Sequence, residues 1–213
     1  MRKIIVVDYG SGNLRSVSKA LEAVAQSGDE VKVSSDPKEV GSADRIVLPG
    51  QGAMGDCMRH LKASGLEEAV RSALATKPVF AVCIGMQMLF RESEEDHAQG
   101  LGILPGRVIR FPASAMRLST GERLKVPEMG WNRVYQAAAH PLWAGIEDGA
   151  WFYLVHSYFV SPEDIRLITG MTVYGLPYAS AVAKDNVFAT QFHPEKSAGN
   201  GLRLYSNFLQ WNP

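Results

Sequence analysis

The chain has few cysteines, no excess of charge of either sign and no long hydrophobic run. Its 213 residues contain only Cys57 and Cys83, too few for a disulfide framework or a four-thiolate zinc site and typical of a reducing compartment. Lys plus Arg and Asp plus Glu each number 22, so no bulk positive field attracts nucleic acid or an anionic membrane. No apolar run approaches the roughly 20 residues that span a bilayer, and a charge interrupts the opening segment before a signal-type region is complete. We therefore expect a cytoplasmic protein with no nucleic-acid or membrane partner.

The first half of the sequence alternates strand and helix patterns. Hydrophobic residues make up 46% and charged residues 21%, as in an ordinary globular protein. Four short runs are typical of strands buried on both faces of a parallel sheet: Ile4–Val7, Val31–Val33, Ile46–Leu48 and Val79–Val82. Helical spacings lie between them, over Leu14–Val24, with Gly28 as the expected C′ glycine, and over Leu66–Leu74. This order predicts a three-layer α/β fold with a mostly parallel, doubly wound sheet.

The second half has a different texture. Turns containing Gly or Pro link its apolar runs, which predicts an antiparallel β extension made of Arg107–Phe111, Trp151–Val155, Leu167–Val173 and Val187–Gln191. An amphipathic segment over Leu202–Leu209 predicts a closing helix. The chain has no repeat, low-complexity tract or linker, so we expect residues 1–213 to form a single domain.

Cys83 stands where a buried strand gives way to a helical pattern. The segment Val79–Phe90 resembles a nucleophile elbow, in which a reactive side chain stands at the end of a strand above the first amides of a helix. Such amides favour a thiolate and can donate hydrogen bonds to an oxyanion. The alternative is a buried structural cysteine, and the elbow alone does not decide between them.

His193 and Glu195 follow another β-branched and aromatic run. A cysteine hydrolase needs a base for the thiol proton and an acid to orient that base, and His-x-Glu supplies both from one strand end. A single histidine here is more often a surface or capping residue. In a parallel sheet, however, the carboxyl ends of the strands share one edge, so Cys83 and His193 can meet there.

A third strand runs into the glycine-rich segment Pro49–Gly55. Its glycines allow a peptide N–H to face a developing negative charge, as in an oxyanion hole. A simple tight turn is one alternative, and a dinucleotide fingerprint is another. The fingerprint requires an acidic residue at the end of the next strand, where Cys83 stands instead. A phosphate-binding Gly-Lys loop and a Cys-x-x-Cys zinc motif are absent, so we expect no cofactor and no metal.

These motifs together resemble the class I, triad-type glutamine amidotransferases, and most closely the glutaminase subunits of imidazole glycerol phosphate synthases. The resemblance runs nearly end to end through Asp8–Leu14, Pro49–Gly52, Cys83–Gln87, Gly100–Ile103 with Gly106, Gly130–Asn132, His156–Tyr158 and His193–Ser197. It implies a flavodoxin-like sheet. The opening segment and the Gly-Trp-Asn motif distinguish these subunits from relatives fused to a synthetase.

The resemblance also implies a role for each matching residue. Cys83 is the expected nucleophile, His193 the base and Glu195 the residue that orients the base. The oxyanion hole and substrate-binding residues are expected to be Gly50, Gln51, Gly52, Ile84 and Gln87. Glutamine would be hydrolysed through a cysteine thioester, and the ammonia passed to a (βα)₈-barrel cyclase subunit in a heterodimer that serves histidine biosynthesis.

Five further positions match the partner interface or channel mouth of that family: Asn13, Trp131, Asn132, Tyr158 and Lys196. Each also has an ordinary explanation. Trp131 and Tyr158 could be core aromatics, Lys196 a solvated charge and Asn13 a helix cap.

The sequence departs from the family pattern at three positions. Ala81 replaces the usual glycine two residues before the nucleophile, Gln51 replaces a small apolar residue, and Glu128 stands where relatives often have His. We expect Ala81 to tighten the turn, Gln51 to affect how easily the Gly50–Gln51 peptide turns, and Glu128 to alter the partner contact. None of the three removes a catalytic atom.

Two other functions stay open at the level of sequence. One is an inactive relative that serves as an interaction subunit, and the other is a glutaminase whose ammonia serves sugar amination in a surface-polysaccharide pathway. Intact Cys83, His193 and Glu195 disfavour the first of these. Cys57 has no assigned role and is expected to be a packed thiol.

Overall fold

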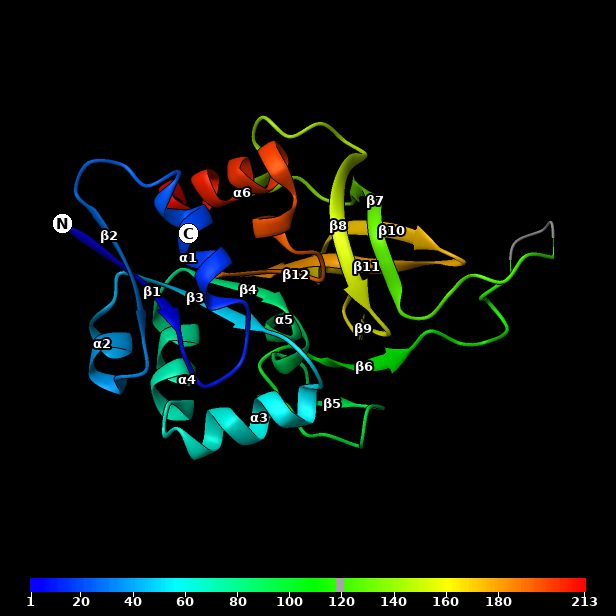
Figure 1. The fold of residues 1–213 in the computed structure, drawn as a ribbon, viewed down its shortest axis with the longest axis horizontal. Helices are drawn as coiled ribbons and strands as arrows, with labels where there is room; N and C mark the ends of the chain where they lie inside the picture. Colours follow the sequence, from blue (N-terminus) through cyan, green and yellow to red (C-terminus); the bar gives the residue numbers. More distant parts are fainter. Residues whose placement is uncertain (118–120) are drawn as a thin grey trace.

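The apolar runs of the first half form the parallel part of one central sheet in the computed structural model, which describes residues 1–117 and 121–213 (Figure 1). The strands are β1 (Arg2–Val7), β2 (Asp29–Ser34), β3 (Arg45–Gly50) and β4 (Val79–Cys83). They lie side by side in the order β2-β1-β3-β4, and every neighbouring pair is parallel. β3 and β4 are buried along their whole length, as strands covered on both faces must be.

Helices cover both faces of this sheet (Figure 1). α1 (Leu14–Glu22) and α6 (Ala198–Gln210) contact each other on one face. The other face carries α2 (Pro37–Ser42), α3 (Met54–Ala63) and α4 (Glu67–Thr76), and the short helix α5 (Ile84–Met88) follows β4 directly. The predicted three-layer, doubly wound fold is confirmed, together with the helices expected over Leu14–Val24, Leu66–Leu74 and Leu202–Leu209.

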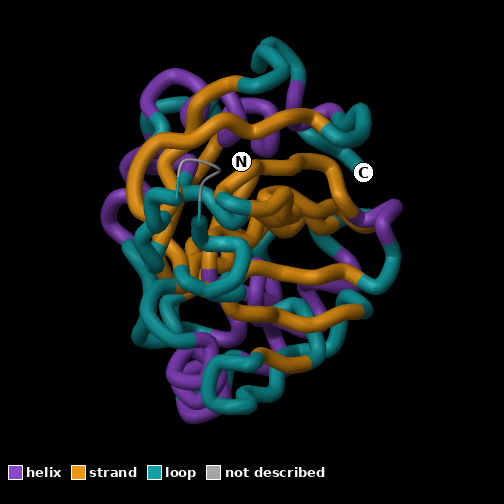
Figure 2. The backbone as a smooth tube through the Cα atoms, turned by 90° about the vertical axis from the view of Figure 1, so that its right-hand side faces the viewer, coloured by secondary structure: helices purple, strands orange, loops and turns teal. Residues whose placement is uncertain are grey.

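The second half extends the sheet with mostly antiparallel strands, which Figure 2 views from their end of the molecule. Their bounds are β5 (Glu92–Ser93), β6 (Gly106–Arg110), β7 (Glu128–Gln136), β8 (Ala150–His156), β9 (Tyr158–Pro162), β10 (Ile168–Tyr174), β11 (Leu176–Lys184) and β12 (Val187–Thr190), with 3₁₀ turns η1 (Pro141–Trp143), η2 (Ile165–Leu167) and η3 (Pro194–Lys196). The predicted antiparallel extension is therefore confirmed for β6, β8 and β10.

The run Val187–Gln191 was expected in the antiparallel extension, and this holds on one side only: β12 is antiparallel to β11 but parallel to β4. It joins the two parts of the sheet as a central strand and is buried along its whole length. A second expectation is wrong. Gly28 is not the C′ residue of α1, which ends at Glu22 with Ala23 as its cap. It forms the turn before β2 at φ +94°.

Aromatic side chains pack α6 against β4 and β12, the two strands that lead to Cys83 and His193. The ring of Phe80 on β4 lies 5.6 Å from that of Phe188 on β12 and 5.3 and 5.4 Å from those of Tyr205 and Phe208 on α6. All four side chains are fully buried. This packing holds β4, β12 and α6 as one rigid unit. Among the described residues, no helix has both the length and the apolar character needed to cross a bilayer.

Candidate active site

Cys83 occupies a sharp turn between β4 and α5. Its backbone has φ 54° and ψ −108°, a left-handed conformation that a non-glycine residue seldom adopts. The turn packs tightly against β3, since a Cβ at Gly85 would lie 2.1 Å from the Leu48 carbonyl oxygen and one at Gly50 would lie 2.5 Å from the Gly85 nitrogen. Both positions therefore require glycine, and their packing holds the strained turn that presents the sulfur. Ala81 lies fully buried inside β4, where it pairs with Leu48 and Ala189, and not in the turn itself.

The imidazole of His193 is held by a carboxylate from the next turn of the chain. η3 folds back after β12 so that Glu195 Oε1 lies 2.8 Å from His193 Nδ1, with both side chains almost completely buried. The backbone around the ring is also fixed, because the His193 N–H donates to the Tyr153 carbonyl and Ser197 Oγ donates to the His193 carbonyl. The other ring nitrogen, Nε2, has no hydrogen-bond partner among the described residues.

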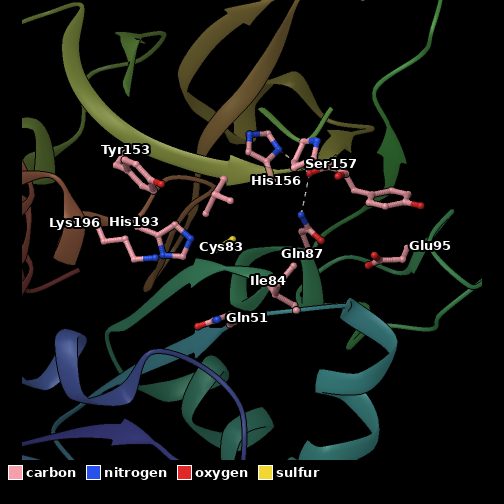
Figure 3. A pocket seen from close by; sticks show the side chains of 14 residues that line it. Gln51, Cys83, Ile84, Gln87, Glu95, Tyr153, His156, Ser157, His193 and Lys196 are labelled. Atoms are coloured by element: carbon pink, nitrogen blue, oxygen red, sulfur yellow. Dashed lines mark hydrogen bonds between the residues drawn. The ribbon is translucent and has the colours of Figure 1, made fainter. Parts of the chain in front are cut away.

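The charge state of His193 follows from its neighbours. Burial disfavours the charged imidazole, but the Cys83 sulfur and the Glu195 carboxylate outweigh that effect and raise the pKa of His193 to about 10. The raised pKa favours the protonated ring beside the sulfur at neutral pH. Figure 3 shows His193 next to Cys83, with Gln87 on the other side of the sulfur.

β3, β4 and β12 end at the same edge of the sheet, and their ends surround a cavity of about 360 Å³. The predicted site residues that line it are Gln51, Gly52, Cys83, Ile84, Gln87, Tyr158, His193 and Lys196. Gly50 and Glu195 are not lining residues: Gly50 lies beneath the elbow and Glu195 is bonded to the His193 ring. The sequence argument that the strand ends meet thus agrees with the placement of these side chains.

Gln191 is a neighbour of Cys83 to which the sequence analysis gave no role. Its Nε2 lies 3.6 Å from Cys83 Sγ, and its Oε1 accepts a hydrogen bond of 3.1 Å from Gln87 Nε2, which also donates to the Tyr158 carbonyl at 3.0 Å. The sequence could have indicated a role for Gln191, because its amide follows a hydrophobic run that is fully buried, and a buried polar group needs hydrogen-bond partners. Gln87 Oε1 is buried without a partner among the described residues and is free to accept a hydrogen bond from a ligand.

The predicted interface residues lie in different surroundings. Trp131 is half exposed on β7 and packs edge-on against Tyr153 at 6.2 Å, and Lys196 Nζ lies 5.6 Å from the centre of the Tyr153 ring. Asn132 donates to Glu128 Oε1 and to the Val173 carbonyl. Asn13 is the first residue before α1, but its side chain makes no capping hydrogen bond. Trp131 is therefore not a core aromatic.

Glu128 is a buried residue and not a surface one. Its Oε2 accepts a hydrogen bond of 2.8 Å from the Tyr178 hydroxyl and lies 3.4 Å from His156 Nε2, and the side chain is 4% exposed. Burial and the Glu128 charge raise the pKa of Tyr178, so the phenol stays protonated and donates. His156 also lines the cavity. Glu128 therefore belongs to the interior beside the site. Its side chain offers no exposed surface through which it could contact a partner directly.

Gly201 on α6 packs directly against the turn that carries Glu195. A Cβ at this position would lie 1.8 Å from the Pro194 carbonyl oxygen, so Gly201→Ala must displace backbone. We expect a loss of about 1–3 kcal/mol in the free energy of unfolding, measured by urea denaturation. Gly199→Ala on the same helix is the matched control, because its Cβ would meet nothing within 4 Å. Equal denaturation midpoints for the two variants would contradict this packing.

No three His, Cys, Asp or Glu side chains of the described ranges are grouped as a metal site would require. Instead, a strained nucleophile elbow, a carboxylate-held imidazole and a glycine-rich strand end surround one cavity. This fold and site define a cysteine hydrolase of the amidotransferase type. The sequence profile of the family "Glutamine amidotransferase class-I" matches residues 5–211, so the chain belongs to that family.

Relatives that match over nearly their full length assign the chain to a more specific family. The chain is 58% identical to the imidazole glycerol phosphate synthase subunit HisH of Dechloromonas aromatica, over 99% of this chain and 97% of the relative. It is 55% identical to the HisH subunit of Aromatoleum aromaticum over the whole of both chains. Within the class I amidotransferases, the chain is thus a member of the HisH family.

Solved structures share the fold at much lower identity. One is PurLQS from Thermotoga maritima, with a TM-score of 0.72 and 18% identity over 98% of both chains. Another is a glutamine amidotransferase with a TM-score of 0.71 and 20% identity over 97% of both chains. These similarities concern the fold alone.

Proposed function

We propose that this protein is the glutaminase subunit of an imidazole glycerol phosphate synthase and supplies ammonia for histidine biosynthesis. The observation that carries the proposal is that Cys83 and His193 line one cavity at the carboxyl edge of the sheet, while Glu195 holds the His193 ring from behind. Full-length relatives at 53–58% identity carry the HisH subunit name, and this supports the pathway.

In the proposed reaction, the Cys83 sulfur attacks the side-chain amide carbon of glutamine. The carbon–nitrogen bond breaks as His193 gives its proton to the departing nitrogen, which leaves as ammonia and a thioester on Cys83. Water then attacks the thioester with His193 as base, which releases glutamate and restores the thiol. Glu195 holds the imidazole by its bond to Nδ1, so that Nε2 is the nitrogen that exchanges protons.

Two groups of residues are proposed to bind the substrate and the charge that develops on it. Backbone amides of Gly50–Gly52 and of Ile84 are the proposed donors to the oxyanion, and their segments surround Cys83. The free Oε1 of Gln87 is the proposed acceptor for an N–H group of glutamine. Gln191 adds a positioning role, since its amide lies between Gln87 and the sulfur.

The proposed partner is a (βα)₈-barrel cyclase subunit that forms a heterodimer with this chain. The word "subunit" in the names of the relatives implies a partner. An exposed face of β7 and β8 supports its position, because Met129, Trp131 and Trp151 are 48–66% exposed and Tyr153, on the same face, also lines the cavity. A partner seated on this face would cover the cavity mouth, and Asn13, Asn132, Tyr158 and Lys196 are the other proposed contact or channel residues.

Trp131→Ala is expected to weaken binding of the cyclase subunit about tenfold or more. Trp131 is half exposed in the free chain, and tryptophans that become buried in an interface are among the residues that contribute most of the binding free energy. Affinity would be measured by titration calorimetry with the cyclase encoded in the same genome. Lys32→Ala is the control, because β2 lies at the edge of the sheet opposite β8. Unchanged affinity of the Trp131 variant would exclude this face as the interface.

The proposed function is tested by reconstitution. The chain and the cyclase subunit, mixed with glutamine and the phosphoribosyl formimino substrate, should release glutamate and imidazole glycerol phosphate in equal amounts. Product from added ammonia in the absence of this chain shows that the cyclase is competent. A competent cyclase that forms no product from glutamine in the presence of this chain would refute the proposal.

Two further proposals concern organisation. One domain over residues 1–213 is supported by the sheet that runs from β2 to β8 across the part of the chain that the structure describes. A cytoplasmic location is supported by Cys57 and Cys83, which are both free thiols.

A further inference from the structure

Three side chains outside the proposed catalytic set bind the backbone of the glycine-rich loop beside Cys83. The Tyr9 hydroxyl donates to the Pro49 carbonyl at 2.6 Å. The Gln51 carbonyl accepts from Ser11 Oγ at 2.9 Å and from Cys57 Sγ at 3.3 Å. Ser11 Oγ and Cys57 Sγ are themselves 3.3 Å apart, so two donors meet at one acceptor.

These donors come from two elements on either side of the loop. Tyr9 and Ser11 lie in the segment after β1, and Cys57 lies in the first half of α3. Tyr9 and Cys57 are buried, which shields their own contacts from competing water, whereas the bond from Ser11 lies at the exposed side of the loop. Burial, and then the Cys57 sulfur, raises the pKa of Tyr9 well above its usual value, so the phenol stays a donor at physiological pH.

The consequence for the loop follows from peptide geometry. In a trans peptide the N–H lies opposite the carbonyl, so holding the Gln51 carbonyl also sets the direction of the Gly52 N–H. Gly52 has φ +91° and, with Gln51, lines the cavity that contains Cys83. With the Pro49 and Gln51 carbonyls held, the Gly50–Gln51 peptide lies between two fixed points.

We propose that Tyr9, Ser11 and Cys57 form a clamp that positions the oxyanion loop for glutamine hydrolysis. The inference rests on the proposed function and extends it to positioning residues that do not touch the substrate. Donors to an oxyanion accelerate a reaction only when they are oriented before charge develops, and they act on the transition state more than on bound substrate. Loosening the clamp therefore lowers kcat and leaves KM nearly unchanged. Cys57 has a role beyond that of a packed thiol.

The test measures glutaminase kcat and KM for the complex with the cyclase subunit. Ser11→Ala and Cys57→Ala should each lower kcat by about threefold to tenfold, the range for loss of one hydrogen bond, with KM changed less than about twofold. Cys57→Ser keeps a donor and should recover at least half of the lost kcat. Ser64→Ala is the matched control: it removes a hydroxyl bond of 2.9 Å to the Leu61 carbonyl at the far end of the same helix and should leave kcat unchanged.

The outcomes separate the clamp from the proposed function. If the wild-type complex uses ammonia but not glutamine, the proposed function fails and the clamp fails with it. If the wild type hydrolyses glutamine and both alanine variants keep full kcat, only the clamp is overturned. A fall in kcat/KM that arises from KM alone, or a Cys57→Ser variant as slow as Cys57→Ala, would also overturn it. Ser11 is partly exposed, so Ser11→Ala keeps the test decisive if a Cys57 variant folds poorly.

Discussion

Cys83→Ala is expected to lower glutamine-dependent turnover by at least about 10⁴-fold, while the cyclase in the same complex still uses added ammonia. Among the described residues that line the cavity, the Cys83 sulfur is the nucleophile placed at the elbow to form a thioester, and the methyl group of alanine cannot replace it. The strained backbone stays in place, since Gly85 packs closely against Leu48 and Gly50 of β3. Glutamate release is measured directly, and the ammonia-driven product is measured in parallel.

Labelling provides the control for this variant. A glutamine-like electrophile should modify Cys83 in the wild type and nothing in Cys83→Ala, because Cys57 is buried and does not line the cavity. Cys57 is thus an internal comparison thiol. Glutamate release that survives in the alanine variant, with partner binding intact, would refute the thioester mechanism.

His193→Asn is expected to lower glutaminase kcat by about 10²–10⁴-fold, the contribution of a positioned general acid and base. Asparagine is a suitable replacement because its side-chain amide can keep the bond that His193 Nδ1 makes to Glu195, while it cannot exchange a proton at the position of Nε2. Stopped assays of glutamate formation measure the effect. A variant with more than about a tenth of wild-type kcat would show that His193 is not the proton carrier.

The same variant also tests whether the His193 imidazole is charged, through the pH dependence of the free energy of unfolding. The pKa of His193 rises from 6.5 to about 10 on folding, so the folded state binds the proton more tightly. The stabilisation is fully present below about pH 6.5 and is lost as the pH rises through about 10, with a slope of at most about 1.4 kcal/mol per pH unit. The free energy of unfolding of the wild type should fall more steeply between pH 7 and pH 10 than that of His193→Asn. Parallel curves would mean that the ring is neutral in the folded protein.

The parallel half of the fold was predictable because its signals are local. Strands β1, β3 and β4 are continuous apolar runs, and the helix around Val70 has a regular apolar stripe. β7, β9 and β11 were not predicted as separate strands. β7 alternates buried and exposed residues and contains Gly130 and Trp131, so its pattern lacks the continuous hydrophobicity that marks the central strands. Antiparallel strands with one open face carry a weaker sequence signal.

The pairing of β12 shows the limit of local pattern. Its sequence, Val-Phe-Ala-Thr, fits either an antiparallel or a parallel neighbour, and the sequence analysis assigned the run only to the antiparallel extension. The register Thr190↔Val82 beside β4 depends on long-range contacts, chiefly the packing of Phe80 and Phe188 under α6. That register brings Gln191 and His193 to the level of Cys83.

The sequence by itself determined the α/β class, the elbow at Cys83 and the His-x-Glu and glycine-rich strand ends, because each depends on residues adjacent in the chain. Only the tertiary structure decided which groups touch: Gln191 beside the sulfur, Glu128 inside the sheet extension, and Ser11 and Cys57 on the Gln51 carbonyl. These contacts join residues from separate elements. Their distances follow from strand order and side-chain packing, which no local spacing specifies.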